Sequence, residues 1–262
     1  MTQTIGPFLA FLTWLQIGFV FAAHAGAAGA PGANPRMLGA AKGNALWQAI
    51  AGADVIYIGE THDNPADHAY ELYVLQGMIK RRISFAIGWE MFDKTQQASL
   101  DAWDRGAISL KELFRETGFD KSWIIYSSVY AKILETAHRH KVRKLALNAP
   151  ATLARKVARG ESLCKRERAL LPRGFAASEV AYRHFVTMMG RHPGLAPNNL
   201  RTFFAAQSLW DQTMAERIIK FSGFRSGARL LVLTGRGHVA GGFGIPFYVR
   251  QKSLLRQLIL FP

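Results

Sequence analysis

The stretch DVIYIGETHDNPADHAY (residues 54–70) decides how the rest of the chain is interpreted. It begins with an apolar run typical of a strand that is covered on both faces, and it changes abruptly to GETHDNP before a helical pattern starts. Asn64 suits the N-cap of that helix and Pro65 suits its first position. Glu60 and His62 precede the cap. They could extend it, or they could belong to a metal site, an acid–base pair or the rim of a cofactor pocket.

Three further apolar runs, at 85–92, 144–150 and 229–239, have the same character as the first. Their alternation with helical patterns predicts an α/β fold, in which helices flank a mostly parallel central sheet. The irregular region 160–199 is expected to be a helical insertion, either a flap or a dimer contact. Segment 244–261 is expected to add one or two short strands. The helical patterns lie at 64–80, 94–104, 110–115, 124–140, 150–159, 178–189 and 200–221.

Two of these helices carry polar groups on the face that we expect to cover the sheet. In 200–221 these groups are Gln207 and Asp211, spaced by one helical turn. In 64–80 the predicted inner face is formed by His68, Leu72, Leu75, Gln76 and Ile79.

Polar residues also stand at the carboxyl end of every predicted strand, where ligands bind in open parallel sheets. Glu60 and His62 follow the first strand, and Glu90, Asn148 and His238 mark the other three. Glu90 is flanked by apolar residues and needs a partner, because burial of a lone charge is costly. Each residue alone has an ordinary explanation as a cap, a turn or a buried ion pair. Their convergence at one edge of the sheet predicts a functional cleft.

Two chemistries fit this set of side chains. Glu60, His62, Glu90 and His238 could hold a divalent metal ion such as zinc, manganese or iron, with an open position for water. The same four residues without a metal could act as general acids and bases, provided that burial raises a carboxyl pKa. The sequence contains no nucleophile elbow, P-loop or HExxH motif, and the spacing does not identify a metal.

The N-terminal residues lie outside the predicted domain, which spans 44–262. Residues 1–30 combine an apolar run with small residues suited to cleavage, so they predict a signal peptide or an uncleaved N-terminal anchor. Residues 31–43 are expected to be a linker. The protein is therefore expected to be exported, either periplasmic or secreted. A lipoprotein is excluded because the sole cysteine is Cys164.

The chain carries a formal net charge of +15, spread over several clusters. Such a charge favours association with an anionic membrane surface or with anionic ligands. Nucleic acid is not an expected partner, because no basic motif is interleaved with aromatic residues.

Five motifs in fixed order resemble those of the ChaN family, the haem-binding uptake group of the Tiki and erythromycin-esterase-like superfamily. They are YIGETHDNPADH, WEMFDKTQQASLDAW, LNAP, AAQSLWDQTMAE and LTGRGHVAGGFGIP. The resemblance implies an exported α/β protein of haem and iron uptake. It also implies that haem is bound between the protomers of a homodimer, with a tyrosine as iron ligand. Relatives in the superfamily use a G-x-x-H signature with a carboxylate for hydrolysis, and this signature matches 59–62.

The resemblance gives a set of candidate haem-binding residues: His62, His68, Tyr126, Tyr130, Asp211 and His238. The chain departs from the family pattern in several ways. Asp67 stands in place of a frequent second histidine and Glu71 in place of a glutamine. Of a His-rich stretch only His184 and His192 remain, and the lipobox cysteine is missing. The leading hypothesis is a haem-binding protein. The first alternative is a hydrolase of the esterase or metal-dependent peptidase type, with Glu60 and His62 as the acid–base or metal-binding pair. The second is an inactive scaffold of the same fold.

Overall fold

The computed structural model describes residues 32–123, 127–189, 200–224 and 227–262. Six strands form one sheet in the order β1–β6–β2–β5–β3–β4, and every neighbouring pair is parallel. The predicted α/β fold is thus confirmed. The strands are β1 (Arg36–Leu38), β2 (Val55–Glu60), β3 (Phe85–Asp93), β4 (Lys144–Asn148), β5 (Arg229–Gly235) and β6 (Gln257–Leu260).

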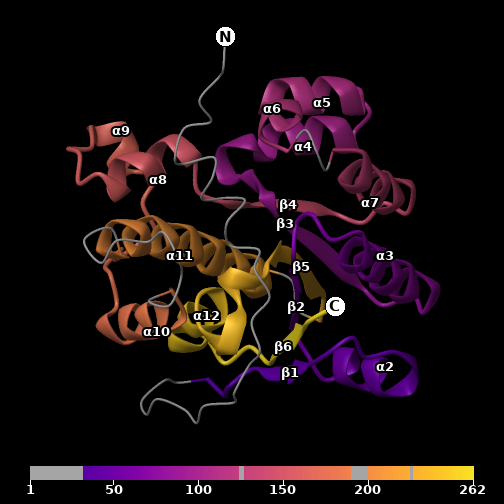
Figure 1. Ribbon diagram of the computed structural model, residues 1–262. Helices are drawn as coiled ribbons and strands as arrows, with labels where there is room; N and C mark the ends of the chain where they lie inside the picture. The colour runs from indigo at the N-terminus through magenta and orange to yellow at the C-terminus, as the bar shows by residue number, and fades with distance from the viewer. Residues whose placement is uncertain (1–31, 124–126, 190–199, 225–226) are drawn as a thin grey trace.

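Helices cover both faces of the sheet (Figure 1). One layer contains α2 (Gly43–Ala51), α3 (Pro65–Lys80), η1 (Lys94–Gln96), α4 (Gln97–Asp104), α5 (Leu110–Thr117), α6 (Phe119–Ser122) and α7 (Ser127–Arg139). The other contains α8 (Ala151–Ala158), α9 (Lys165–Arg168), α10 (Glu179–Met189), α11 (Leu200–Phe224) and α12 (Ile245–Lys252). Short turns η4 (Arg236–His238) and η5 (Ala240–Gly242) link β5 to α12.

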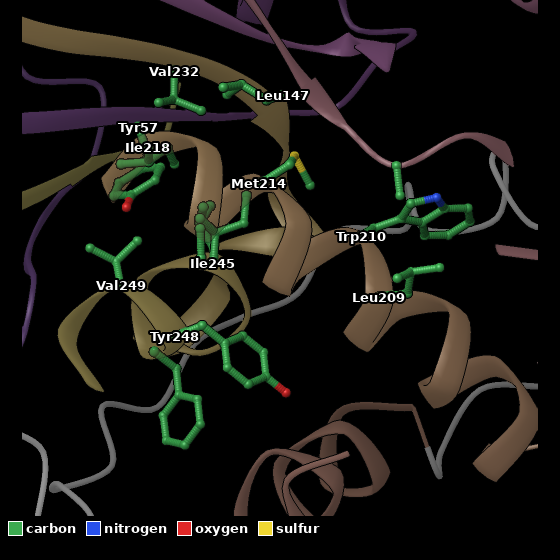
Figure 2. Close-up of a cluster of buried hydrophobic side chains, with 14 of the residues drawn as sticks. Tyr57, Leu147, Leu209, Trp210, Met214, Ile218, Val232, Ile245, Tyr248 and Val249 are labelled. Atoms are coloured by element: carbon green, nitrogen blue, oxygen red, sulfur yellow. The ribbon is translucent and has the colours of Figure 1, made fainter. Parts of the chain in front are cut away.

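The apolar runs are continuous because the central strands contribute side chains to two hydrophobic cores, one on each face of the sheet. In β2, Val55 and Tyr57 face the α8–α12 layer, whereas Ile56 and Ile58 face the α2–α7 layer. This alternation follows from the period of two in strands. Figure 2 shows the first of these cores, where residues such as Met214 of α11 pack towards the sheet. Both faces of the central strands are therefore buried, and the carboxylates of β2 and β3 lie towards the carboxyl ends of these strands.

Of the one or two short strands expected in 244–261, one forms, β6. Residues 245–252 form the helix α12 instead of a second strand. Pro246 explains the difference, because it occupies the first turn of α12, where no backbone N–H is needed. The fourth predicted strand also ends early, at Gly235, and the chain continues through η4.

The predicted inner face of α3 is partly wrong. Gln76 is exposed, and Leu72 and Ile79 are only half-buried. His68 and Leu75 are buried as expected. The other buried side chains of this helix are those of Asp67, Tyr70, Glu71, Val74 and Met78.

The N-terminal part of the chain contributes an edge strand to the sheet. The edge strand β1 lies within 31–43, the range expected to be a linker, and pairs with β6. The predicted signal peptide or anchor at 1–30 lies outside the described residues. None of the helices described is both long and apolar enough to span a bilayer.

Candidate functional site

Three neighbouring strands end at one edge of the sheet and position the first side chains. Glu60, the last residue of β2, is in register with Gly235, the last residue of β5. Glu90 comes from β3, on the other side of β5. Its Oε2 atom accepts hydrogen bonds from the Thr234 hydroxyl at 2.6 Å and from the Gly235 N–H at 2.7 Å. The strand order therefore brings together residues that are 30 and 145 positions apart along the chain.

The loop between β2 and α3 is held by its own side chains. Asn64 caps α3, since its Oδ1 atom accepts a hydrogen bond from the Ala66 N–H at 2.9 Å. Asp67 accepts from the Thr61 N–H at 2.7 Å and from the Asn64 side-chain amide at 2.8 Å. These bonds fix the path of the chain between Glu60 and α3, and thereby the direction of the His62 side chain.

Glu60 is 1% exposed and orients two other groups. Its Oε1 atom accepts hydrogen bonds from the Tyr130 hydroxyl of α7 at 2.6 Å and from His62 Nδ1 at 2.8 Å. His62 must carry a proton on Nδ1 to make this bond, so Nε2 is the nitrogen that remains for other chemistry. The side chain of His62 keeps 8% of its area exposed, compared with 3% for His68 and 6% for His238.

His68 and Glu71 lie one turn apart on the buried face of α3. His68 Nε2 is 2.8 Å from the carbonyl oxygen of His62, to which it donates. Its Nδ1 atom is 3.0 Å from Glu71 Oε2 and 3.0 Å from Glu60 Oε2. Burial lowers the pKa of His68, but the two nearby carboxyl groups, Glu60 and Glu71, raise it to about 11. Burial and the nearby charge of Glu60 hold the pKa of Glu71 well above its usual range.

The second half of the site is built around His238 in η4. Its Nδ1 atom is 2.5 Å from Asp211 Oδ1 and 2.8 Å from the side-chain nitrogen of Gln207, both on α11. Its Nε2 atom is 3.3 Å from Glu90 Oε1. Burial alone would lower the pKa of His238, but the charges of Glu90 and Asp211 raise it to about 10. Burial would raise the pKa of Glu90, but His238 and the other neighbours lower it to about 2. Glu90 and His238 therefore form a buried ion pair at neutral pH.

Glu90 connects the two halves. Its Oε1 atom faces His238 Nε2 and, at 4.0 Å, His62 Nε2. Gly235 leaves room for this arrangement, because a Cβ atom there would lie 2.9 Å from His62 Nε2. The result is a continuous buried chain of acids and imidazoles, called here the acid–imidazole network: Tyr130, Glu60, His62, His68, Glu71, Glu90, His238 and Asp211.

Comparisons with known proteins agree with this fold. The family described as "Haem-binding uptake, Tiki superfamily, ChaN" matches residues 46–249. The chain belongs to this family. Two solved structures share the fold. A structure describing cofacial haem binding to ChaN of Campylobacter jejuni has a TM-score of 0.63 at 19% identity, covering 83% of this chain and 84% of that one. A mutant of the erythromycin esterase EreC in its open conformation has a TM-score of 0.52 at 14% identity, covering 83% and 72%. Among curated proteins, none matches significantly.

The structure brings together most of the site residues predicted for this ChaN-family chain. Asn148 stays apart, and its Oδ1 atom accepts from the N–H of Ala149. Tyr126 lies outside the described residues. The catalytic, metal and haem roles remain predictions. The residues found in the acid–imidazole network are Glu60, His62, His68, Glu90, Tyr130, Asp211 and His238.

Sequence reasoning missed Glu71 as a member of the site. It lies three residues after His68, so helical spacing alone would place both on one face. Glu71 also belongs to the group best placed for a metal ion in the part of the chain described. That group consists of Glu60, His68 and Glu71, whose ligand atoms lie within 4.8 Å of one another. Of the four residues predicted as metal ligands, it includes only Glu60.

Haem fits some of the described candidates better than others. A tyrosine ligand must offer a free, deprotonated oxygen to the iron. Tyr130 is fully buried, its hydroxyl donates to Glu60, and burial raises its pKa well above the usual range. Its geometry suits a residue that positions Glu60. His62 fits better as a residue beside haem, because its Nε2 is not committed to a hydrogen bond with Glu90.

Proposed function

We propose that this chain is an exported haem-binding protein of haem and iron uptake, in which Tyr126 is the iron ligand and His62 lies beside the haem. The family match over 46–249 carries this proposal, and the likeness to a ChaN structure with cofacial haem supports it. Cofacial binding between two protomers would make the functional unit a homodimer. The net charge of +15 would favour the anionic propionates.

The position of the neighbours of Tyr126 supports its role. The Trp123 ring contacts His62 edge-on, with 4.9 Å between ring centroids. On the other side of Tyr126, α7 begins at Ser127 and carries Tyr130 into the acid–imidazole network. Tyr126 therefore follows by three residues a tryptophan that contacts the least buried imidazole of the network.

Haem titration of the purified protein, followed by the Soret band, tests this function. Tyr126→Phe should weaken haem binding by at least about tenfold, which corresponds to 1.4 kcal/mol. Tyr182→Phe on α10 is the matched control and should bind like wild type. Sedimentation with and without haem should show dimers in the loaded protein. Absence of a Soret change at micromolar haem would refute the proposal, and equal affinities of Tyr126→Phe and Tyr182→Phe would refute the assignment of the ligand.

Export and membrane association are parts of the same proposal. Cell fractionation and mass spectrometry of the N-terminus should find either a chain cut near residue 30 or an intact chain in the membrane fraction. A full-length chain in the cytoplasm would contradict export. Binding to vesicles of anionic lipid should weaken as salt rises. Equal binding to neutral and anionic vesicles would argue against an electrostatic surface.

A second function, hydrolysis, is favoured by the orientation of His62. Glu60 holds Nδ1–H, as the acid of a catalytic triad does, so Nε2 can accept a proton from an attacking water molecule. Glu60 and Glu90 would stabilise the imidazolium that forms. A screen of esters and peptides with wild type, Glu60→Ala and Asp63→Ala decides this. Asp63 is an exposed acid three residues away and serves as the control. Equal rates for wild type and Glu60→Ala would remove the hypothesis.

A further inference from the structure

The acid–imidazole network contains a cluster in which Glu60 has a part in the proposed hydrolysis, whereas the other two members, His68 and Glu71, have a role in neither proposed function. Glu60 lies at the end of β2, whereas His68 and Glu71 lie on α3. All three side chains are buried, with 1%, 4% and 0% of their residue areas exposed. The three ligand atoms lie within 4.8 Å of one another.

His68 is oriented as a metal-binding histidine is. Metal-ligating histidines almost always donate the other ring N–H to a carboxylate, a backbone carbonyl or water. Here Nε2 donates to the carbonyl oxygen of His62 at 2.8 Å, which directs Nδ1 towards both carboxyl groups. Glu60 is oriented in a similar way, because the hydroxyl of Tyr130 and Nδ1 of His62 both bond to its Oε1 atom. The Oε2 atom of Glu60 therefore points into the cluster.

Two buried oxygens in the cluster lack hydrogen-bond partners: Glu60 Oε2 and Glu71 Oε1. Glu60 Oε2 lies 3.0 Å from His68 Nδ1, but the ring N–H is directed to Glu71 instead. Buried polar atoms are nearly always paired, so two such oxygens beside one imidazole indicate a missing partner. Within the described residues, neither carboxylate forms an ion pair with a lysine or an arginine. In the metal-free protein the imidazolium of His68 is the cation beside both carboxyl groups. A divalent ion bound at Nδ1 would replace the proton there and balance the charge of the two carboxylates.

The distances suit a transition-metal ion. Nδ1 of His68 is 3.0 Å from an oxygen of each carboxylate. Two ligands at right angles and about 2.1 Å from a metal lie about 3.0 Å apart. An imidazole with two carboxylates is a ligand set for zinc, manganese or iron. We propose that Glu60, His68 and Glu71 form a buried site for one divalent first-row transition-metal ion, which fixes β2 to α3.

The test uses the haem-free, full-length protein. Plasma mass spectrometry of the purified chain should find about one zinc or manganese ion per chain. After chelation, titration with Zn²⁺ or Mn²⁺ should restore one ion and raise Tm. Exchange with a chelator should be slow, because all three ligands are buried. Absence of stoichiometric metal in both the purified and the titrated protein would overturn the proposal.

Two isosteric variants locate the site. Glu71→Gln should weaken metal binding by more than the 10- to 100-fold that loss of an outer partner typically costs. Glu135→Gln, at an exposed position of α7, is the control and should bind metal as wild type does. Retention of metal binding in Glu71→Gln would overturn the proposal. Should Glu71→Gln fail to fold, X-ray absorption of the zinc-loaded wild type decides. One imidazole per ion is expected, and two would overturn the proposal.

Discussion

Substitution of Gly235 by alanine probes the acid–imidazole network without changing its charges. The Gly235 backbone has φ −58° and ψ 142°, a conformation open to alanine. The added Cβ atom would lie 2.9 Å from His62 Nε2 and 3.4 Å from its Cε1. Ordinary contacts of this kind are about 3.4–4 Å, so His62 must move by roughly 0.5 Å. It cannot rotate freely, because Glu60 holds Nδ1.

Gly52→Ala is the matched control for this substitution. Gly52 ends α2 with φ −83°, and a Cβ atom there would lie 3.6 Å from the nearest atom, the carbonyl oxygen of Ala49. Both variants restrict the unfolded chain equally, which stabilises each by about 0.4–1 kcal/mol. Only Gly235→Ala adds overpacking, which costs about 1–3 kcal/mol. The two variants should therefore differ in free energy of unfolding by about 1–3 kcal/mol.

Urea denaturation and thermal melts measure this difference. At about 3 °C per kcal/mol for a chain of this size, the two Tm values should differ by about 3–9 °C, with Gly235→Ala the lower. Any activity that depends on His62 should fall in Gly235→Ala and persist in Gly52→Ala. Equal stability of the two variants would refute the claim that His62 is held rigidly against β5.

Three further predictions test other contacts. Tyr130→Phe should lower the free energy of unfolding by about 1.5–3 kcal/mol in urea, because its hydroxyl donates to the buried Glu60 carboxylate; an unchanged midpoint would contradict this. Burial lowers the pKa of His184 to about 4, so the unfolded chain binds more protons between about pH 6.5 and 4. The contribution of neutral His184 to the free energy of unfolding should be fully present above that window. It should fall by about 1–2 kcal/mol as pH drops through the window, after allowance for the partial exposure of His184. His184→Phe should flatten the pH profile of Tm, and an unaltered slope would refute this. Asp104→Ala should lower the free energy of unfolding by up to about 3–5 kcal/mol, because it leaves the buried ammonium of Lys144 without its carboxylate. Lys144→Met, which removes the buried charge itself, should cost less. A lower Tm for Lys144→Met than for Asp104→Ala would refute this.

The sheet could be predicted from sequence because burial on both faces leaves a simple signal. Strands such as β2 and β5 read as continuous apolar runs, and the helices between them require parallel pairing. The same signal fails for α12, whose apolar residues 245–249 are buried on all sides of a short helix. Periodicity cannot separate a short buried helix from a buried strand, and Pro246 was the local feature that could have done so.

The candidate site was predictable where polar residues interrupt apolar runs, as Glu60 and Glu90 do. Glu71 was not, because a glutamate on a helix normally lies on the solvent side. The buried face of α3 begins with Asp67, His68 and Glu71, so the helix lacks the apolar stripe that would reveal its orientation. Thr234 and the N–H of Gly235 were also missed, since their role depends on strand order rather than on residue type.

The burial and pairing of the acid–imidazole network limit which substitutions can reveal its function. Each acid in it is paired with an imidazole, and almost no solvent reaches either. Removal of one partner from a buried pair leaves an uncompensated charge, which costs about 3–5 kcal/mol and threatens the fold. A variant such as Glu90→Ala would then lose haem binding or hydrolysis whether or not Glu90 takes part in either. Substitutions that keep the charges, such as Gly235→Ala, separate the two explanations, because they displace His62 and leave every ion pair with both partners.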